Sequence, residues 1–228
     1  MNIKEISQKT KTSIFHEISV LFLFIITGIV GRTVLVEMQI QPFPNFEIIM
    51  VLTFLAVLFI RPTLAFMVPL FAMIGSDLLL GNAIFAGSQM NKIIFFTYTG
   101  FLLITMISML IRKQSHIRLK YLTLPSMGAI IGTGVVFVLI YDLWTNIGWW
   151  YLMYPHSIEY LMSVLIAGVP FMVYHVLSAL FTFTLIAIPI GYLILNKTSL
   201  PQPLETRIWH RLPLITITIL LVIISVIG

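Results

Sequence analysis

The sequence has no cysteine and very few charged residues, and each absence excludes a class of chemistry. Without cysteine, the chain forms no disulfide bond, iron–sulfur cluster or thiolate site. Only 9% of its 228 residues are Asp, Glu, Lys or Arg, whereas a soluble domain carries about 25%. With 59% hydrophobic residues and a mean hydropathy of +1.06, the composition predicts one compact membrane domain.

Common enzyme motifs are also absent. The sequence contains no HExxH, no GxSxG and no Walker loop. Ser76-Asp77 and Tyr141-Asp142 superficially resemble the aspartate pair of intramembrane aspartyl proteases, but the Tyr-Asp comes second here and the glycines of the other motif do not match. His175 has no second histidine at i+4 to form a metal site. We therefore expect no enzymatic activity, no cofactor and no bound metal.

Apolar runs separated by short polar segments predict an all-α, polytopic membrane helix bundle. The first run, 18–36, exceeds the about 7–15 apolar residues of a signal peptide and has no A-x-A site after it, so we expect a retained span. The run from 160 to 195 is too long for one crossing. Pro170 predicts a break within it because proline removes a backbone donor, which leaves an interfacial or re-entrant piece at 160–169. The predicted spans are 18–36, 46–60, 64–80, 93–111, 126–144, 171–195 and 212–227.

These spans divide the chain into three parts. Residues 1–17 form a cytoplasmic N-terminal segment, 18–195 a six-helix membrane domain, and 196–228 a cytoplasmic loop with an appended C-terminal transmembrane helix. The second span is short, so its ends are expected to rest on neighbouring helices. Gly128 and Gly132 form a GxxxG motif in the fifth span, which predicts close helix packing there.

Basic and acidic residues are distributed to opposite sides of the predicted spans. Of the 13 Lys and Arg residues, 11 lie on one side, and only Arg32 and Lys92 lie on the other. The positive-inside rule therefore places the N-terminus in the cytoplasm and, after seven crossings of the cell membrane, the C-terminus outside. The net charge of +5 suits anionic lipid head groups and gives no support to nucleic-acid binding. Five of the eight acidic residues lie at the outer side: Glu37, Glu47, Asp77, Asp142 and Glu159.

The outer ends of the spans also collect amides and aromatic residues, which predicts a ligand site there. Asp77 lies within an apolar run, where a charge costs up to about 2.5–3.5 kcal/mol, so it either lines a cavity or pairs with Arg32. The aromatic residues between 144 and 154 form either an interfacial belt or a lid over a flat ligand. His175 either contacts the ligand or is satisfied by a neighbour. The candidate substrate-binding residues are Arg32, Asn45, Asp77, Asn82, Asp142, Trp144, Asn146, Trp149, Trp150 and His175.

Short motifs between Gly31 and Leu195 carry a resemblance to a known group of proteins. They are Pro44-Asn45-Phe46, Ser76-Asp77 followed by Leu80-Gly81, and Ala167-Gly168-Val169-Pro170-Phe171. In these motifs the chain resembles an uncharacterised group of small prokaryotic membrane proteins related to the substrate-binding (S) components of energy-coupling factor (ECF) transporters.

This resemblance implies a six-helix core with an outward-open substrate pocket, capped by the loop after the first helix. S components pair with a membrane coupling subunit and two cytoplasmic ATPases, and they carry vitamins or transition-metal ions. The chain departs from the S-component pattern in several ways. The Ala-x-x-x-Ala motif of the first helix is replaced by Gly28 and Gly31, and the seventh span is additional. The N-terminus, Met1-Asn2-Ile3, lacks the histidine-rich segment of nickel and cobalt carriers.

Two functions of different classes follow. The first is a membrane-embedded substrate-binding component for uptake of a small organic micronutrient, neutral or cationic because the outer side is acidic. Its partners would be this solute, the lipid bilayer and a coupling subunit with ATPases. The alternative is a non-catalytic accessory or assembly subunit of a larger membrane complex. An enclosed cavity lined by a carboxylate, amides and aromatic side chains favours the first function, and a solidly packed bundle favours the second.

Overall fold

The computed structural model describes residues 3–41, 48–82 and 89–197, and every regular element in these ranges is helical. Asn45 and the predicted span at 212–227 lie outside the described residues. The elements are α1 (Ile3–Glu37), α2 (Ile49–Phe59), α3 (Pro62–Ala65), α4 (Met67–Leu79), α5 (Gln89–Lys120), α6 (Leu124–Met153), α7 (Ile158–Thr182), the π-helix η1 (Phe183–Ala187) and α8 (Ile188–Lys197).

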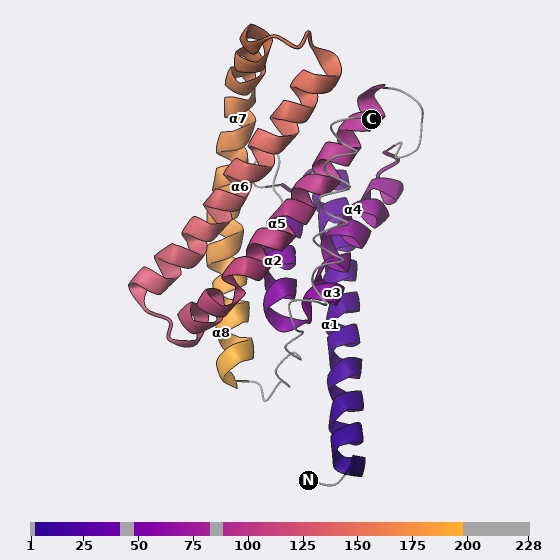
Figure 1. The fold of residues 1–228 in the computed structure, drawn as a ribbon, viewed down its shortest axis with the longest axis vertical. Coiled ribbons are helices and arrows are strands. Elements are labelled where there is room, and N and C mark those ends of the chain that lie inside the picture. The colour runs from indigo at the N-terminus through magenta and orange to yellow at the C-terminus, as the bar shows by residue number, and fades with distance from the viewer. Residues whose placement is uncertain (1–2, 42–47, 83–88, 198–228) are drawn as a thin grey trace.

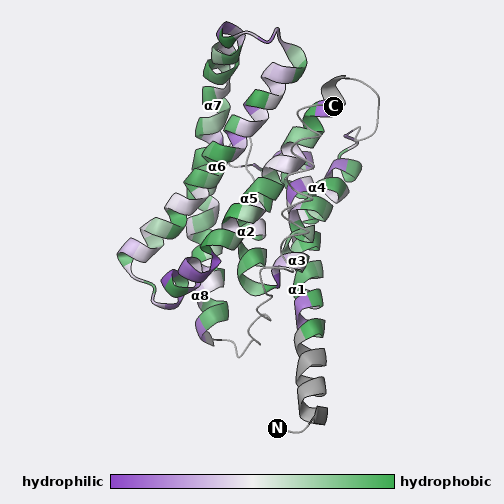
Figure 2. Ribbon diagram, viewed as in Figure 1, coloured by the Kyte–Doolittle hydropathy of each residue, from purple (hydrophilic) through white to green (hydrophobic). Residues whose placement is uncertain are grey.

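Consecutive helices run up and down through an elongated bundle (Figure 1). Most of their turns are hydrophobic, and hydrophilic residues gather at the α6–α7 connection and at the C-terminal end of α5 (Figure 2). Five helical stretches are long and apolar enough to cross a membrane: Ile14–Glu37, Pro62–Leu79, Lys92–Lys120, Leu124–Met153 and Ile158–Asn196. The prediction of an all-α membrane bundle is confirmed at this level.

The short helix α2 lies at the centre of the bundle. All 11 of its residues are buried, among α1, α4 and α5 and their neighbours. It covers about 17 Å, at about 1.5 Å per residue, much less than the hydrocarbon thickness of about 30 Å. Near its C-terminal end, His116 Nε2 donates to the Leu58 carbonyl at 2.8 Å and Arg112 donates to the same oxygen at 3.4 Å. The described part of the second predicted span, residues 49–60, is therefore surrounded by protein.

The predicted break at Pro170 is wrong. Helix α7 continues through this residue, and the apolar helical stretch runs without interruption from Ile158 to Asn196. No separate interfacial piece exists at 160–169, because a proline removes only one backbone donor and membrane helices tolerate this loss. The irregular turn lies instead at η1, where the Phe183 ring packs against Phe54 and Phe137 at centroid distances of 5.3 and 6.2 Å.

The close packing predicted for Gly128 and Gly132 is not found among the described residues. A Cβ atom at either position would meet nothing within 4 Å among the described residues. The glycine spacing correctly places both on one face of α6, but that face does not contact another described helix. Helix α6 makes close approaches at Gly134, where a Cβ atom would lie 2.6 Å from the Phe183 ring, and at Gly148, where one would lie 2.3 Å from the Phe96 ring.

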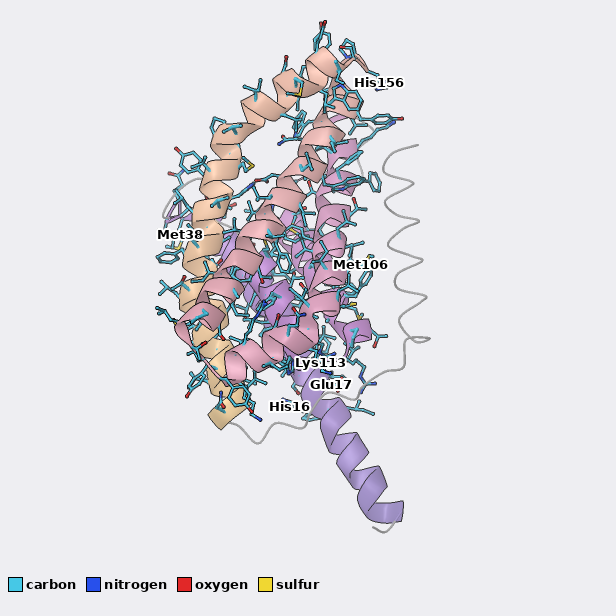
Figure 3. The ribbon with its side chains drawn as sticks, turned by 60° about the vertical axis from the view of Figure 1, so that its left-hand side comes forward. His16, Glu17, Met38, Met106, Lys113 and His156 are labelled. Atoms are coloured by element: carbon cyan, nitrogen blue, oxygen red, sulfur yellow. The ribbon has the colours of Figure 1, made fainter. Side chains whose placement is uncertain are left out.

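One end of the bundle carries an ion pair that ties α1 to the turn after α2. Arg61 Nε donates to Glu17 Oε2 at 2.6 Å, and Glu17 is 2% exposed. Figure 3 shows Glu17 and Lys113 toward the lower end of the bundle and His156 at its upper end. Several of the residues assigned to the cytoplasmic side by the charge distribution thus share one end of the bundle, and their orientation in the membrane stays a prediction.

Candidate functional site

A cavity of about 460 Å³ lies between α6 and α7, near their connection. The α6 residues that line it fall at positions i, i+3, i+4 and i+7, and those on α7 fall at i, i+3, i+4, i+7 and i+11, so each set forms one stripe along the face of its helix. The lining residues are Asp142, Thr145, Asn146, Trp149 and Tyr154 on one side and Val164, Ala167, Gly168, Phe171 and His175 on the other.

A carboxylate and an imidazole meet at the end of this cavity farthest from the connection. Asp142 is 4% exposed, and its Oδ1 lies 2.6 Å from Nδ1 of His175. Its second oxygen, Oδ2, is buried and has no hydrogen-bond partner among residues 14–41, 48–82 and 92–196. Buried polar atoms are almost always hydrogen-bonded, by protein, water or a ligand. An unsatisfied carboxylate oxygen beside a cavity therefore favours a ligand or water that donates a hydrogen bond or carries positive charge.

The amide of Asn146 reaches the cavity because residue 168 is a glycine. A Cβ atom at position 168 would lie 2.5 Å from Nδ2 of Asn146 and 2.8 Å from its Oδ1. Any larger side chain would displace the amide, so Gly168 is the reason that α7 leaves room for it. The amide adds one donor and one acceptor group to the cavity.

Asp77 belongs to a different cluster, in which both its oxygens are satisfied. Arg32 and Asn82 donate to Oδ1 at 2.6 and 2.9 Å, and the Tyr98 hydroxyl donates to Oδ2 at 2.7 Å. Arg32 also donates to Ser76 Oγ at 2.7 Å. Of the two interpretations of Asp77, the structure shows the ion pair with Arg32. Arg32, Asp77 and Asn82 come together as predicted neighbours, yet none of them lines the α6–α7 cavity.

Two of the candidate tryptophans serve packing instead of the cavity. Trp144 Nε1 donates to Thr99 Oγ1 at 2.9 Å and its ring packs on Phe96, which joins α6 to α5. Trp150 Nε1 donates to the carbonyl of Ser157 at 3.1 Å and so closes the α6–α7 turn. Trp149 does line the cavity, together with Asp142, Asn146 and His175. Four of the predicted site residues are thus brought together.

Some residues of the cavity, and the ion pair of Glu17 with Arg61, were not predicted from the sequence. Thr145 lies three positions after Asp142 and one before Asn146, and helical spacing alone would have placed it on the same stripe. Glu17 was not singled out because it lies near the start of the first apolar run, where a charged residue is usually interpreted as marking the end of a membrane span. Of the side chains that the structure describes, no group of three or more His, Asp or Glu is placed to hold a metal ion.

Comparisons with known proteins identify a family for the chain, and the function of that family is unknown. Neither a search of curated proteins nor a search of solved structures found a match. Residues 12–202 match the model of a family described as a family of unknown function, DUF6580, and because this match covers most of the chain, the protein belongs to DUF6580.

Proposed function

We propose that this protein is a membrane-embedded solute-binding component that captures a small organic micronutrient, neutral or cationic, in the α6–α7 cavity. The observation that carries the proposal is the unsatisfied Oδ2 atom of Asp142, buried in a residue that lines a cavity of about 460 Å³. Small-molecule sites in proteins are concave and mostly apolar, with a few placed polar groups. Here Val164, Ala167 and Phe171 supply apolar surface, and Asp142 and Asn146 supply the polar groups.

The chemistry of the lining selects against anions. Asp142 offers a carboxylate oxygen as acceptor, and the aromatic faces of Trp149 and Tyr154 attract positive charge. A solute with N–H donors or a cationic nitrogen would satisfy Oδ2 and lie against these rings. A polyanion would meet the carboxylate without a lysine or arginine in the described lining to offset it.

Uptake needs a source of energy, and the chain has no nucleotide-binding motif. We therefore propose a separate membrane subunit coupled to cytoplasmic ATPases as the partner, as the resemblance to ECF S components implies. The basic residues that share the Glu17–Arg61 end of the bundle would face this partner and the anionic lipid head groups. Affinity purification from native membranes should recover such a subunit. Recovery of a stable respiratory or secretory complex instead would support the accessory-subunit hypothesis.

The binding proposal is tested by looking for a bound molecule directly. We expect native mass spectrometry of gently extracted protein to show a co-purifying small molecule that is lost in Asp142→Asn. The loss of a charged hydrogen bond of about 1.5–3 kcal/mol lowers affinity by about tenfold or more. Glu159→Gln is the matched control, because it makes the same acid-to-amide change on an exposed residue at the start of α7.

The outcome is decisive in either direction. Retention of the molecule in Glu159→Gln and its loss in Asp142→Asn would support the proposal. A protein that is empty in every preparation, or a molecule equally retained in both variants, would contradict a solute site at Asp142.

A further inference from the structure

We infer that the ligand of the α6–α7 cavity is an amphiphile with an ammonium head group, which reaches the cavity sideways from the lipid bilayer. The inference rests on the proposed function and names the class of solute. It follows from three features of the cavity: its depth along the helices, the side on which it opens, and the position of its polar groups.

The polar end of the cavity lies deep along the hairpin of α6 and α7. Asp142 is 11 residues before Met153, and His175 is 17 residues after Ile158. At about 1.5 Å per residue, these separations are about 17 and 26 Å of helix, compared with about 30 Å of hydrocarbon. With the α6–α7 connection at the membrane surface, the Asp142–His175 pair lies inside the hydrocarbon layer.

The cavity opens on the outer face of α7. Phe171 lines the cavity and is nevertheless 59% exposed, and Ala167 is also exposed. The residues beside them on α7, Ile166, Val169 and Val173, are exposed and apolar. In a bilayer this face contacts lipid chains, so the described border of the opening is apolar and faces lipid.

The side of α6 that faces α5 is closed by packing. Phe96 lies against Gly148 so closely that a Cβ atom there would overlap its ring, and Trp144 is hydrogen-bonded to Thr99. Deeper in the bundle, Tyr141 packs between Phe101 and His175, at centroid distances of 4.9 and 6.2 Å. These contacts close the α5 side, so among the described residues the cavity is open along α7 and at its end near the connection, where Tyr154 is 45% exposed.

A charged acceptor below an apolar opening selects one kind of molecule. His175 already contacts Oδ1 of Asp142, and Oδ2 still needs a donor. A carboxylate in hydrocarbon that has only an imidazole as its described partner gains from an added positive charge. An ammonium head group supplies both the donor and the compensating charge. The apolar body of the same molecule would extend past Phe171 and Ala167 into the surrounding lipid. A hydrophilic vitamin would be unfavourable in this environment. An aminolipid of the bilayer and a free amphiphilic amine share this chemistry.

The first experiment asks into which solvent the bound molecule partitions. Purified wild-type protein and Asp142→Asn are extracted with chloroform and methanol, and both phases are analysed by mass spectrometry. We expect the molecule lost in Asp142→Asn to lie in the organic phase and to contain a basic nitrogen. Phosphorus in that molecule would identify a bilayer lipid and its absence a free amphiphile, and both results support the inference.

Two other results would overturn the inference in distinguishable ways. An Asp142-dependent molecule in the aqueous phase would overturn the amphiphile and leave the proposed solute site standing. The absence of an Asp142-dependent molecule from both phases would overturn the site itself.

The second experiment tests the sideways path with defined probes. Dodecylamine and butylamine are titrated into the protein in phosphatidylglycerol nanodiscs, which contain no competing ammonium lipid, and the unfolding midpoint is recorded. We expect dodecylamine to raise the midpoint at concentrations where butylamine has no effect. Ala167→Trp, which fills the opening, should weaken the apparent affinity for dodecylamine by about tenfold or more.

Val173→Trp is the matched control, since Val173 is 51% exposed on the same helix and does not line the cavity. It should bind dodecylamine as the wild type does. Equal responses to the two amines, or equal affinities of Ala167→Trp and Val173→Trp, would overturn the sideways path. These two variants retain Asp142, so the test does not depend on whether Asp142→Asn folds.

Discussion

The side-chain amide of Asn146 occupies the space that a Cβ atom at position 168 would need, with Nδ2 2.5 Å from that position. We therefore predict that Gly168→Ala displaces the Asn146 amide and weakens ligand binding in the cavity. Overpacking of this kind typically costs about 1–3 kcal/mol, so binding should fall by about fivefold or more. Retention of the co-purifying molecule measured by native mass spectrometry gives the readout.

A double-variant cycle separates this effect from a general disturbance of α7. In an Asn146→Ala background the conflicting amide is gone, so adding Gly168→Ala should change binding little further. The two substitutions would then be strongly non-additive, as expected for side chains in contact. Additive losses would show that Gly168 acts on the cavity by another route.

The Arg32–Asp77 pair is predicted to stabilise the fold without contributing to the cavity. The side chain of Asp77 is only 5% exposed and is the carboxylate partner of Arg32. Removal of the Asp77 carboxylate therefore leaves Arg32 without this partner. Breaking a buried pair costs about 3–5 kcal/mol, and the 20% exposure of Arg32 places Asp77→Leu at the lower end of this range. Reversible unfolding in mixed micelles measures the loss.

The double variant Arg32→Met/Asp77→Leu should be less destabilised than the sum of its single variants, because no charge is left alone. Ligand retention per folded molecule should equal that of the wild type in all three proteins. Selective loss of the ligand in a folded Asp77 variant would show that the two clusters are functionally connected.

The absence of cysteine allows the orientation to be tested with single cysteines. Lys113 and His156 are exposed and lie at opposite ends of the bundle (Figure 3). We expect a membrane-impermeant thiol reagent to label His156→Cys in intact cells and Lys113→Cys only after permeabilisation. The opposite pattern for both variants would invert the predicted topology and place the α6–α7 connection in the cytoplasm.

Two glycines of α6 are predicted to respond oppositely to a methyl group. A Cβ atom at Gly134 would lie 2.6 Å from the Phe183 ring, whereas one at Gly128 would meet no described atom within 4 Å. Gly134→Ala should lose about 1–3 kcal/mol of stability through overpacking. Gly128→Ala should be neutral or gain up to about 1 kcal/mol, because alanine restricts the unfolded chain. Equal destabilisation of the two in thermal unfolding would mean that Gly128 also has a packing partner.

Hydrophobic runs predicted the main helices well, since the length of an apolar run is a local property of the sequence. Their ends were less predictable. Helix α6 continues to Met153, nine residues beyond the predicted end at Trp144, because Trp144 and Trp150 are held by hydrogen bonds to Thr99 and Ser157. These bonds depend on tertiary packing or on a turn, and no periodicity reveals them.

The types of residue that form the candidate site could be predicted from the sequence. Which of these residues lie together could be predicted only in part. Both Asp77 and Asp142 were recognised as unusual, because a carboxylate in an apolar run is costly wherever it lies. Which of them pairs with a cation and which lines a cavity depends on distances between helices. Arg32 is 45 positions from Asp77, and His175 is 33 positions from Asp142. Nothing in the local sequence indicates which acid takes which partner.

The central position of α2 also has a consequence for how the protein is made. A helix of 11 residues is too short to be recognised and released into the bilayer as an independent span. Its entire surface is covered by protein in the finished structure. We therefore expect helix α2 to reach its final position only after α5, with His116 and Arg112, has been made, so that the first half of the chain completes its packing only with the second.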